Sequence, residues 1–160
     1  YLYMYFISLS PQAGPVYKPT KNEDVEKMLD LAGVDETDVV IDPGSGDGRI
    51  VIAASSRGAQ AIGYEIDPFL VHQSRKRIKK LGLQDKAEIK LKSFWQADFN
   101  QATVVATYLF PKYMLKLKDQ LQKSLNHPVK LVSNDYQIPD LDYLQKEGSI
   151  YLYKIIPLLS

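Results

Sequence analysis

Short apolar runs alternate along this chain with segments whose apolar residues recur at the spacing of an amphipathic helix. Continuous apolar runs of this length are typical of strands that are buried on both faces of a parallel sheet. We expect strands over residues 39–41, 59–64, 87–91, 103–108 and 129–133, with helices over 50–56, 68–81 and 112–124 between them. This alternation predicts an open, mostly parallel sheet with helices on both faces.

The last part of the chain has a different pattern. Residues 143–147 and 150–155 have the composition of two strands joined by a turn at Gly148 and Ser149, which predicts a hairpin. Its last strand is expected to run antiparallel to the rest of the sheet. The predicted fold class is therefore α/β, an open, mostly parallel Rossmann-like sheet with a C-terminal antiparallel hairpin strand.

The chain starts with an apolar and aromatic stretch, YLYMYFISL at residues 1–9, followed by a connector that contains prolines and glycine. A bilayer span needs about 20 apolar residues, so this stretch is the end of a longer membrane anchor, an edge strand, or a disordered leader packed on the domain. We expect residues 1–19 to form this leader and connector, and residues 20–160 to form one folded domain. Thr20 and Glu23 predict a capping box for a helix that Gly33 ends.

Composition narrows the chemistry. A chain of 160 residues, 45% hydrophobic with a net charge of +1, fits one globular domain without a global attraction to nucleic acid. It has no cysteine, and His72 and His127 lie far apart, so we expect no metal site. The basic run at residues 75–80 is either a patch for RNA or anionic lipid or, as we favour, a solvated helix face with Ile78 turned inward.

A glycine-rich loop, DPGSGDG at residues 42–48, follows the first predicted strand directly. Glycines let the backbone turn tightly and approach a ligand where a Cβ would collide. A dinucleotide fingerprint is G-x-G-x-x-G, with a pyrophosphate at the helix N-terminus. Here Gly48 comes one residue early and Arg49 stands where the third glycine would be, which favours a ligand without a pyrophosphate.

Glu65 ends the second predicted strand, about 20 residues beyond the glycines. A carboxylate at this place can accept hydrogen bonds from both hydroxyls of a free ribose. The other interpretation is a structural glycine turn beside a solvated glutamate. Because both features follow strands in the expected order, we favour a nucleotide site, and S-adenosylmethionine as its ligand.

Around this loop the segment VIDPGSGDGRIV, residues 40–51, resembles class I S-adenosylmethionine-dependent methyltransferases. It is most similar to the small archaeal and bacterial protein-lysine methyltransferases, which are related to the mitochondrial family that methylates lysines in membrane-embedded energy-converting proteins. The resemblance covers nearly the whole domain and includes the segments YKPT (17–20), GYEIDP (63–68), ATVVATYLF (102–110) and VSNDYQIP (132–139). It implies the class I methyltransferase fold and transfer of a methyl group to a protein lysine.

The resemblance also implies a cofactor site spread over several strand ends. Tyr17 and Thr20 would lie in the segment that closes over the cofactor. Asp42 and the glycines would lie beside the methionine moiety, and Glu65 on the ribose. Ser93 stands where many relatives have an aspartate that faces the adenine amine. The full set of expected cofactor residues is Tyr17, Thr20, Asp42, Gly44, Ser45, Gly46, Gly48, Glu65, Ile66, Ser93 and Phe94.

The methyl acceptor is expected at the ends of the fourth and fifth strands. Methyl transfer from a sulfonium is a direct displacement, so the enzyme mainly has to hold the reacting atoms in line. A lysine amine, with an unperturbed pKa of about 10.4, must also lose a proton. The candidate catalytic residues are Tyr108, Asn134, Asp135 and Tyr136. The alternative is that the two tyrosines only pack and that Asn134 and Asp135 make a turn.

Three functions remain open. Leu109-Phe110-Pro111 differs from the Asn-Pro-Pro-aromatic motif of enzymes that methylate base amines, so we favour a protein-lysine N-methyltransferase. The alternatives are a methyltransferase that acts on RNA or a small molecule, and a non-catalytic cofactor-binding module that regulates a partner. We expect a protein substrate that presents a lysine and is associated with a membrane. The enzyme would work in the cytoplasm or at the cytoplasmic face of a membrane, and the sequence leaves its oligomeric state open.

Overall fold

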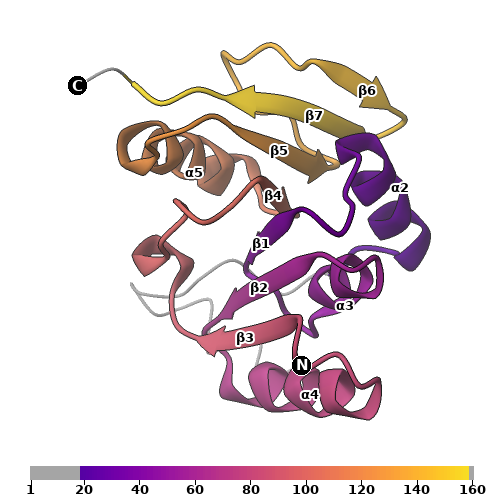
Figure 1. Ribbon diagram of the computed structural model, residues 1–160. Helices are drawn as coiled ribbons and strands as arrows, with labels where there is room; N and C mark the ends of the chain where they lie inside the picture. Colours follow the sequence, from indigo (N-terminus) through magenta and orange to yellow (C-terminus); the bar gives the residue numbers. More distant parts are fainter. Residues whose placement is uncertain (1–18, 159–160) are drawn as a thin grey trace.

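The centre of the molecule is a seven-stranded sheet with the strand order β3-β2-β1-β4-β5-β7-β6 (Figure 1). The structure is a computed structural model, and it describes residues 19–158. Strands β1 to β5 run parallel to one another, while β7 runs antiparallel to both β5 and β6. The predicted mostly parallel sheet with a C-terminal antiparallel hairpin is confirmed. The strands are β1 (Val39–Pro43), β2 (Gln60–Glu65), β3 (Ala87–Leu91), β4 (Val104–Thr107), β5 (Val129–Asn134), β6 (Gln145–Glu147) and β7 (Ile150–Ile155).

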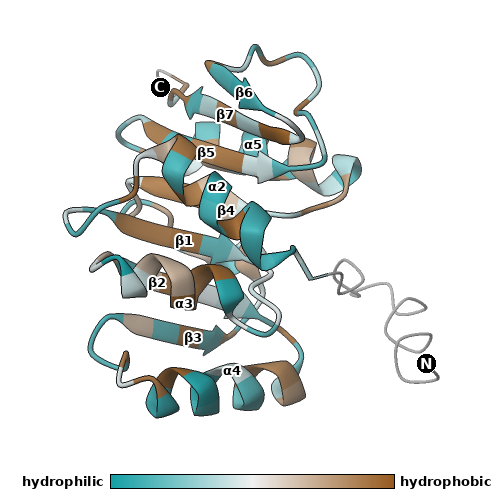
Figure 2. Ribbon diagram, turned by 90° about the vertical axis from the view of Figure 1, so that its right-hand side faces the viewer, coloured by the Kyte–Doolittle hydropathy of each residue, from teal (hydrophilic) through white to brown (hydrophobic). Residues whose placement is uncertain are grey.

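Helices cover both faces of this sheet, as the alternating pattern predicts. One core contains side chains from α2, α3 and α4 with Val40 of β1, and the opposite core contains side chains from α5 with Ile41 of the same strand. The central strands are accordingly mostly hydrophobic in Figure 2. The helices of the described residues are α2 (Asn22–Ala32), α3 (Arg49–Ser56), α4 (Pro68–Lys80), the 3-10 helix η1 (Phe94–Gln96) and α5 (Pro111–Ser124).

Strand β1 lies at the point where the strand order reverses. It pairs on one side with β2, where Asp42 is opposite Gly63, and on the other side with β4, where Ile41 is opposite Val105. The chain therefore builds the sheet outward in one direction through β3 and then returns to add β4. In open parallel sheets ligands bind at such a reversal, beyond the carboxyl ends of the strands.

The predicted capping box of the first helix is wrong. Helix α2 begins at Asn22, after an N-terminal cap position held by Lys21, and no side chain makes a capping hydrogen bond there. Thr20 is instead buried, and its carbonyl oxygen accepts a hydrogen bond from Arg49. This contact comes from a distant part of the chain, and the helix starts one residue later than a cap at Thr20 would require.

The other predicted helix ends are confirmed. Gly33 ends α2 in the left-handed conformation, with φ of 66°. Asp67 caps α4, where its carboxylate accepts the backbone N–H of Phe69 at 2.8 Å, and Pro68 is the first helical residue. The hairpin turn also falls at Gly148 and Ser149, as expected.

Residues 1–18 of the predicted leader and connector lie outside the described residues. Among the helices that the structure does describe, none combines the length and the apolar composition needed to cross a bilayer.

Candidate active site

The glycine loop between β1 and α3 depends on backbone conformations that side chains rarely adopt. Gly44, Gly46 and Gly48 have φ values of 82°, 54° and 79°, in the left-handed region that glycine enters at no steric cost. The N–H groups of Gly44 and Ser45 both donate to the carbonyl oxygen of Tyr64, each at 2.9 Å. The loop is thus folded tightly over the end of β2.

Two glycines also allow close packing around this loop. A Cβ at Gly48 would lie 2.9 Å from the Cβ of Ser74 on α4, and a Cβ at Gly63 would lie 2.5 Å from the Oγ of Ser45. Gly63 lies inside a strand, where an isolated glycine indicates close approach of another segment. That signal identifies Gly63 as part of the site, which the sequence interpretation missed.

Glu65 lies at the end of β2 with its carboxylate turned toward the glycine loop. Its Oε2 accepts the N–H of Gly46 at 2.8 Å, while its Oε1 accepts the N–H groups of Ile66 and Asp67 at 2.8 and 2.9 Å. The predicted association of Glu65 with the loop is therefore seen as a direct contact. Charge-assisted hydrogen bonds of this kind fix the carboxylate in one orientation.

Asp42 is the most deeply buried carboxyl group at these strand ends, with 3% of its surface exposed. Burial raises its pKa well above the ordinary range, and the nearby negative charges of Glu65 and Asp47 raise it further. A buried carboxyl without a cation beside it favours its neutral form. The approach of a positively charged ligand would reverse this preference.

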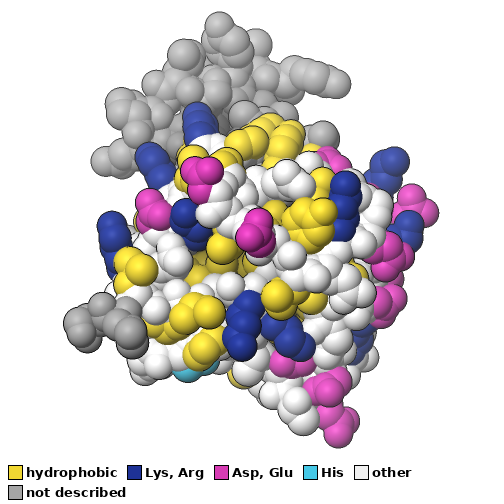
Figure 3. Space-filling view, turned by 90° about the horizontal axis from the view of Figure 1, so that it is seen from above, with side chains coloured by type: hydrophobic (Ala, Val, Ile, Leu, Met, Phe, Trp, Pro, Cys, Tyr) yellow, Lys and Arg dark blue, Asp and Glu magenta, His cyan; other side chains and the backbone are white. Residues whose placement is uncertain are grey.

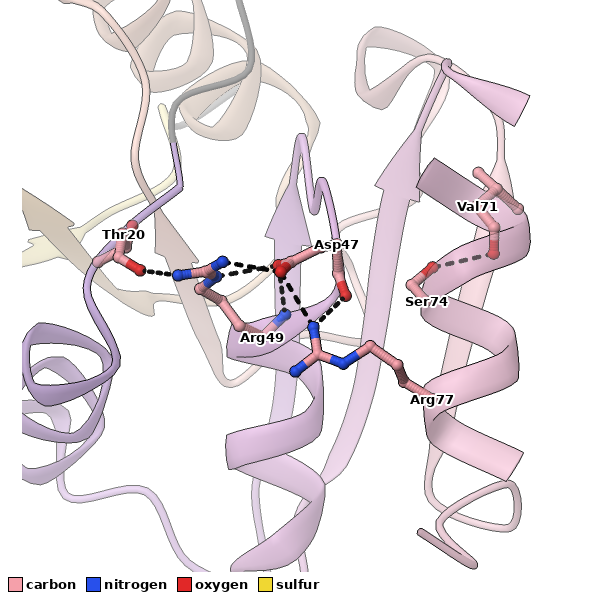
Figure 4. A network of polar contacts seen from close by, with 6 residues as sticks. All are labelled: Thr20, Asp47, Arg49, Val71, Ser74 and Arg77. Atoms are coloured by element: carbon pink, nitrogen blue, oxygen red, sulfur yellow. Dashed lines mark hydrogen bonds and ion pairs between the residues drawn. The ribbon is translucent and has the colours of Figure 1, made fainter. Parts of the chain in front are cut away.

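Asp47 is the third carboxyl group of the loop, and two arginines neutralise it (Figure 4). Burial works to raise its pKa, but the hydrogen bond and charge of Arg49 and the charge of Arg77 outweigh that effect and lower it. Arg49 also reaches the carbonyl oxygen of Thr20. Thr20, a predicted cofactor residue, is in this way attached to the loop through its backbone.

Three further predicted cofactor residues lie just after β2 and β3. Ile66 is 42% exposed. The hydroxyl of Ser93 accepts the N–H of Trp95 and caps η1. Phe94 is buried in the core beside Trp95, with ring centroids 4.2 Å apart. Tyr17, also expected in this set, lies outside the described residues.

Three of the four candidate catalytic residues come together beyond β4 and β5. The hydroxyl of Tyr108 donates to the Asp135 carboxylate at 2.9 Å, and the rings of Tyr108 and Tyr136 stack with centroids 6.0 Å apart. We call these three residues the tyrosine–aspartate cluster. Phe110, which was not predicted, packs its ring against Tyr136 at 5.8 Å. Asn134 is buried, and its Oδ1 accepts the hydroxyl of Ser149 in the hairpin turn.

The backbone at Asp135 is strained. Its φ is 65°, and the N–H of Tyr136 donates to the carbonyl oxygen of Asn134 at 2.9 Å across it, which makes a γ-turn. A non-glycine residue in such a region costs about 1–3 kcal/mol, and such residues occur most often at functional sites. The turn expected at Asn134 and Asp135 is therefore present. It does not prevent Asp135 from contacting Tyr108, so a turn and a role for Asp135 at the acceptor site are compatible.

The deciding comparison is with protein families. Residues 42–145 match the family described as the ANTKMT methyltransferase domain. The chain belongs to this family. The match covers the glycine loop, Glu65 and the tyrosine–aspartate cluster. The predicted relationship to protein-lysine methyltransferases and the prediction of an S-adenosylmethionine-dependent methyltransferase are confirmed.

Individual relatives of the family agree with this result. The chain is 35% identical to a protein-lysine N-methyltransferase of Saccharolobus islandicus over 76% of its own length and 77% of that protein. It is 33% identical to a lysine N-methyltransferase of Xenopus laevis that is named for ATP synthase, over 82% of its length, but it spans 59% of that relative.

A solved structure is also similar along almost its full length. It is a crystal structure described as an RNA methyltransferase of Salinibacter ruber in complex with S-adenosyl-L-homocysteine. The TM-score is 0.85 at 38% identity, over 89% of this chain and 97% of that one. The two kinds of comparison thus agree on the enzyme class and name different acceptors.

The residues at the site fit the cofactor of this enzyme class. Positive φ values at its three glycines let the loop turn tightly beyond β1, and Glu65 presents a fixed carboxylate beside it. Among the described residues, the buried hydroxyls of Ser45 and Thr107 have no hydrogen-bond partner, and buried polar groups ordinarily have one. The described residues contain no group of three or more acidic or histidine side chains that could hold a metal.

Proposed function

We propose that this chain transfers methyl groups from S-adenosylmethionine to lysine side chains of a protein. The observation that carries the proposal is the tyrosine–aspartate cluster, in which a carboxylate lies beside two stacked aromatic rings. A carboxylate and the faces of tyrosine rings both attract an ammonium group. The names of the relatives in Saccharolobus and Xenopus support the same acceptor.

In this proposal the cofactor would lie across the carboxyl ends of β1, β2 and β4. The Glu65 carboxylate would accept a ribose hydroxyl, and the glycine loop and Asp42 would hold the methionine part. Ile66, Ser93 and Phe94 would line the rest of the site. When bound, S-adenosylmethionine supplies a methyl group on a positively charged sulfonium. Asp42, whose pKa is raised by burial in the free protein, ionises more readily next to such a charge.

The chain's own residues would prepare the lysine. Asp135 is exposed and attracts the lysine ammonium from solvent, while the rings of Tyr108 and Tyr136 surround the alkyl chain. A lysine amine held there would lose hydration, and the positive charge of a bound sulfonium would repel its proton, so both effects would favour the neutral amine. The released proton leaves through the exposed Asp135 carboxylate to water. Orientation and desolvation then account for most of the chemistry, without a covalent intermediate.

RNA is the second candidate acceptor, because the similar Salinibacter protein is described as an RNA methyltransferase. The basic run on α4 gives it little support. Ile78 is buried as predicted, Arg75 donates to the carbonyl oxygen of Ile89, and Arg77 binds Asp47. Two of its cations therefore have internal partners. On the opposite side of the molecule from α4, which Figure 3 shows, basic side chains are interspersed with acidic and apolar ones.

The acceptor class can be tested with isotopically labelled S-adenosylmethionine. The protein is incubated with separated membrane, soluble protein and RNA fractions of a cell extract, and labelled species are identified by mass spectrometry. We expect label on lysine side chains of a protein. Label in RNA alone would refute the proposal and support the second candidate.

A matched pair of variants links this result to the cluster. Asp135 and Asp140 are both exposed aspartates with positive φ values of 65° and 58°. Asparagine tolerates this conformation, so Asp135→Asn and Asp140→Asn both keep the backbone and remove one charge. We expect Asp135→Asn to lose about tenfold or more in lysine methylation, and Asp140→Asn to retain it.

We further propose that the substrate lysine lies at a membrane surface and that the enzyme works in the cytoplasm or at the cytoplasmic face of that membrane. The support is the name of the Xenopus relative, which gives ATP synthase as the source of its substrate. Cell fractionation combined with labelling of each fraction tests this. Label confined to soluble proteins would contradict the membrane substrate.

A further inference from the structure

Arg49 binds two separate segments with one guanidinium group. Its Nε and Nη2 donate to the two oxygens of the Asp47 carboxylate at 2.9 and 2.7 Å, which is a bidentate contact. Its third nitrogen, Nη1, donates to the carbonyl oxygen of Thr20. Figure 4 shows the guanidinium between the two groups. All three nitrogens of the side chain are therefore used.

The two segments that Arg49 joins both belong to the predicted cofactor site. Asp47 lies inside the glycine loop, between Gly46 and Gly48. Thr20 is buried and lies 29 positions before Arg49, just ahead of α2. Arg49 occupies the place of the third glycine in a dinucleotide fingerprint. At this position the chain carries a large charged residue that connects the loop with Thr20.

We propose that Arg49 is a positioning residue for the cofactor. It holds the glycine loop and the backbone at Thr20 in the arrangement that the cofactor requires, before binding takes place. Ordering these segments in advance reduces the entropy that binding would otherwise cost. The inference rests on the proposed placement of the cofactor against the glycine loop, and it concerns binding only, whatever the methyl acceptor.

Arginine is specifically suited to this position. A planar guanidinium can grip a carboxylate with two nitrogens and still present a third to another acceptor. A lysine carries the same charge on one flexible ammonium, which cannot reproduce this planar fork. Arg49→Lys thus keeps the charge next to Asp47 and loses the connection between the two segments.

Arg77 provides the matched control. It also donates to Asp47 Oδ2, at 3.0 Å, and to the Asp47 carbonyl oxygen. It comes from α4, and its side chain is 45% exposed, compared with 24% for Arg49. Both of these hydrogen bonds end on Asp47, so they do not join the loop to Thr20. Arg77→Met therefore removes a cation from Asp47 while the contact between Arg49 and Thr20 remains.

The test is calorimetric titration of the full chain with S-adenosylhomocysteine, for the wild type, Arg49→Lys, Arg49→Met and Arg77→Met. We expect the Kd to rise about tenfold in both Arg49 variants and to stay within about twofold in Arg77→Met. Hydrogen exchange of the ligand-free proteins is measured in parallel. Exchange at the first turn of α2 should accelerate in the Arg49 variants and remain unchanged in Arg77→Met.

Two outcomes would overturn the inference. One is unchanged affinity in Arg49→Lys, and the other is an equal loss of affinity in the Arg49 and Arg77 variants, which would indicate a general effect of the charge on Asp47. Glu65→Ala is included as a reference. If it also binds like the wild type, the placement of the cofactor itself is wrong, whereas weakened binding there alone rejects only the role of Arg49.

Discussion

Replacing Glu65 by alanine perturbs the proposed ribose contact most directly. A carboxylate offers about four lone-pair sites. Backbone N–H groups of Gly46, Ile66 and Asp67 occupy three of them. The remaining site is on Oε2, which accepts one loop amide and can accept one ribose hydroxyl without displacing any protein contact.

This geometry sets the size of the expected effect. A hydrogen bond to a charged acceptor contributes about 1.5–3 kcal/mol. Loss of one such bond from the ribose predicts that Glu65→Ala raises the Kd for S-adenosylmethionine by about 10- to 150-fold. The three backbone amides of Gly46, Ile66 and Asp67 also lose their acceptor, but Glu65 is only half-buried, so water can replace it there.

Calorimetric titration with S-adenosylmethionine measures this change, and urea denaturation of each variant establishes that the protein is folded. Asp67→Asn is the control, because it removes a neighbouring charge and retains a side-chain acceptor for the Phe69 N–H. We expect its Kd to stay within about twofold of the wild type. An unchanged Kd in Glu65→Ala, or an equal loss in both variants, would refute the proposed ribose contact.

Three further predictions concern other parts of the site. Burial raises the pKa of Asp42, so ionisation of this group destabilises the ligand-free fold. Asp42→Asn should therefore be more stable than the wild type above the folded-state pKa of Asp42, and the difference should vanish below the unfolded-state pKa of about 4. Urea denaturation at several pH values measures this difference. Gly63→Ala should lower the free energy of unfolding by about 1–3 kcal/mol, since its Cβ meets Ser45 Oγ at 2.5 Å; wild-type stability would contradict this packing. Tyr108→Phe removes the bond to Asp135 and should lower kcat about tenfold with unchanged cofactor Kd; weaker cofactor binding would contradict its role on the acceptor side.

The strands of the sheet could be predicted because each strand is indicated by residues that are neighbours in the sequence. The run from Ile150 to Ile155 follows a turn at Gly148, and the strand β7 has these bounds. The glycine loop and Glu65 were also predictable, because strand ends and glycines in sequence order already indicate a nucleotide site. Contact between them follows from the parallel pairing of β1 with β2.

Contacts between distant segments could not be predicted in this way. The bond from Arg49 to Thr20 joins residues 29 positions apart, and the capping box that the sequence suggested at Thr20 does not form. The bond from Tyr108 to Asp135 joins strand ends 27 positions apart, and Asp135 lies in a γ-turn. Local sequence patterns do not indicate that these segments approach each other, and they do not indicate the strained backbone at Asp135.

A crystal structure with bound S-adenosylhomocysteine tests the central claim most directly. We expect a ribose hydroxyl within about 2.7–3.0 Å of the Glu65 carboxylate, and the sulfur facing the tyrosine–aspartate cluster. Such an arrangement would place the transferred methyl group next to the site proposed for the lysine. A ligand that does not contact Glu65, or a sulfur that faces away from Tyr108, Asp135 and Tyr136, would contradict the proposed site.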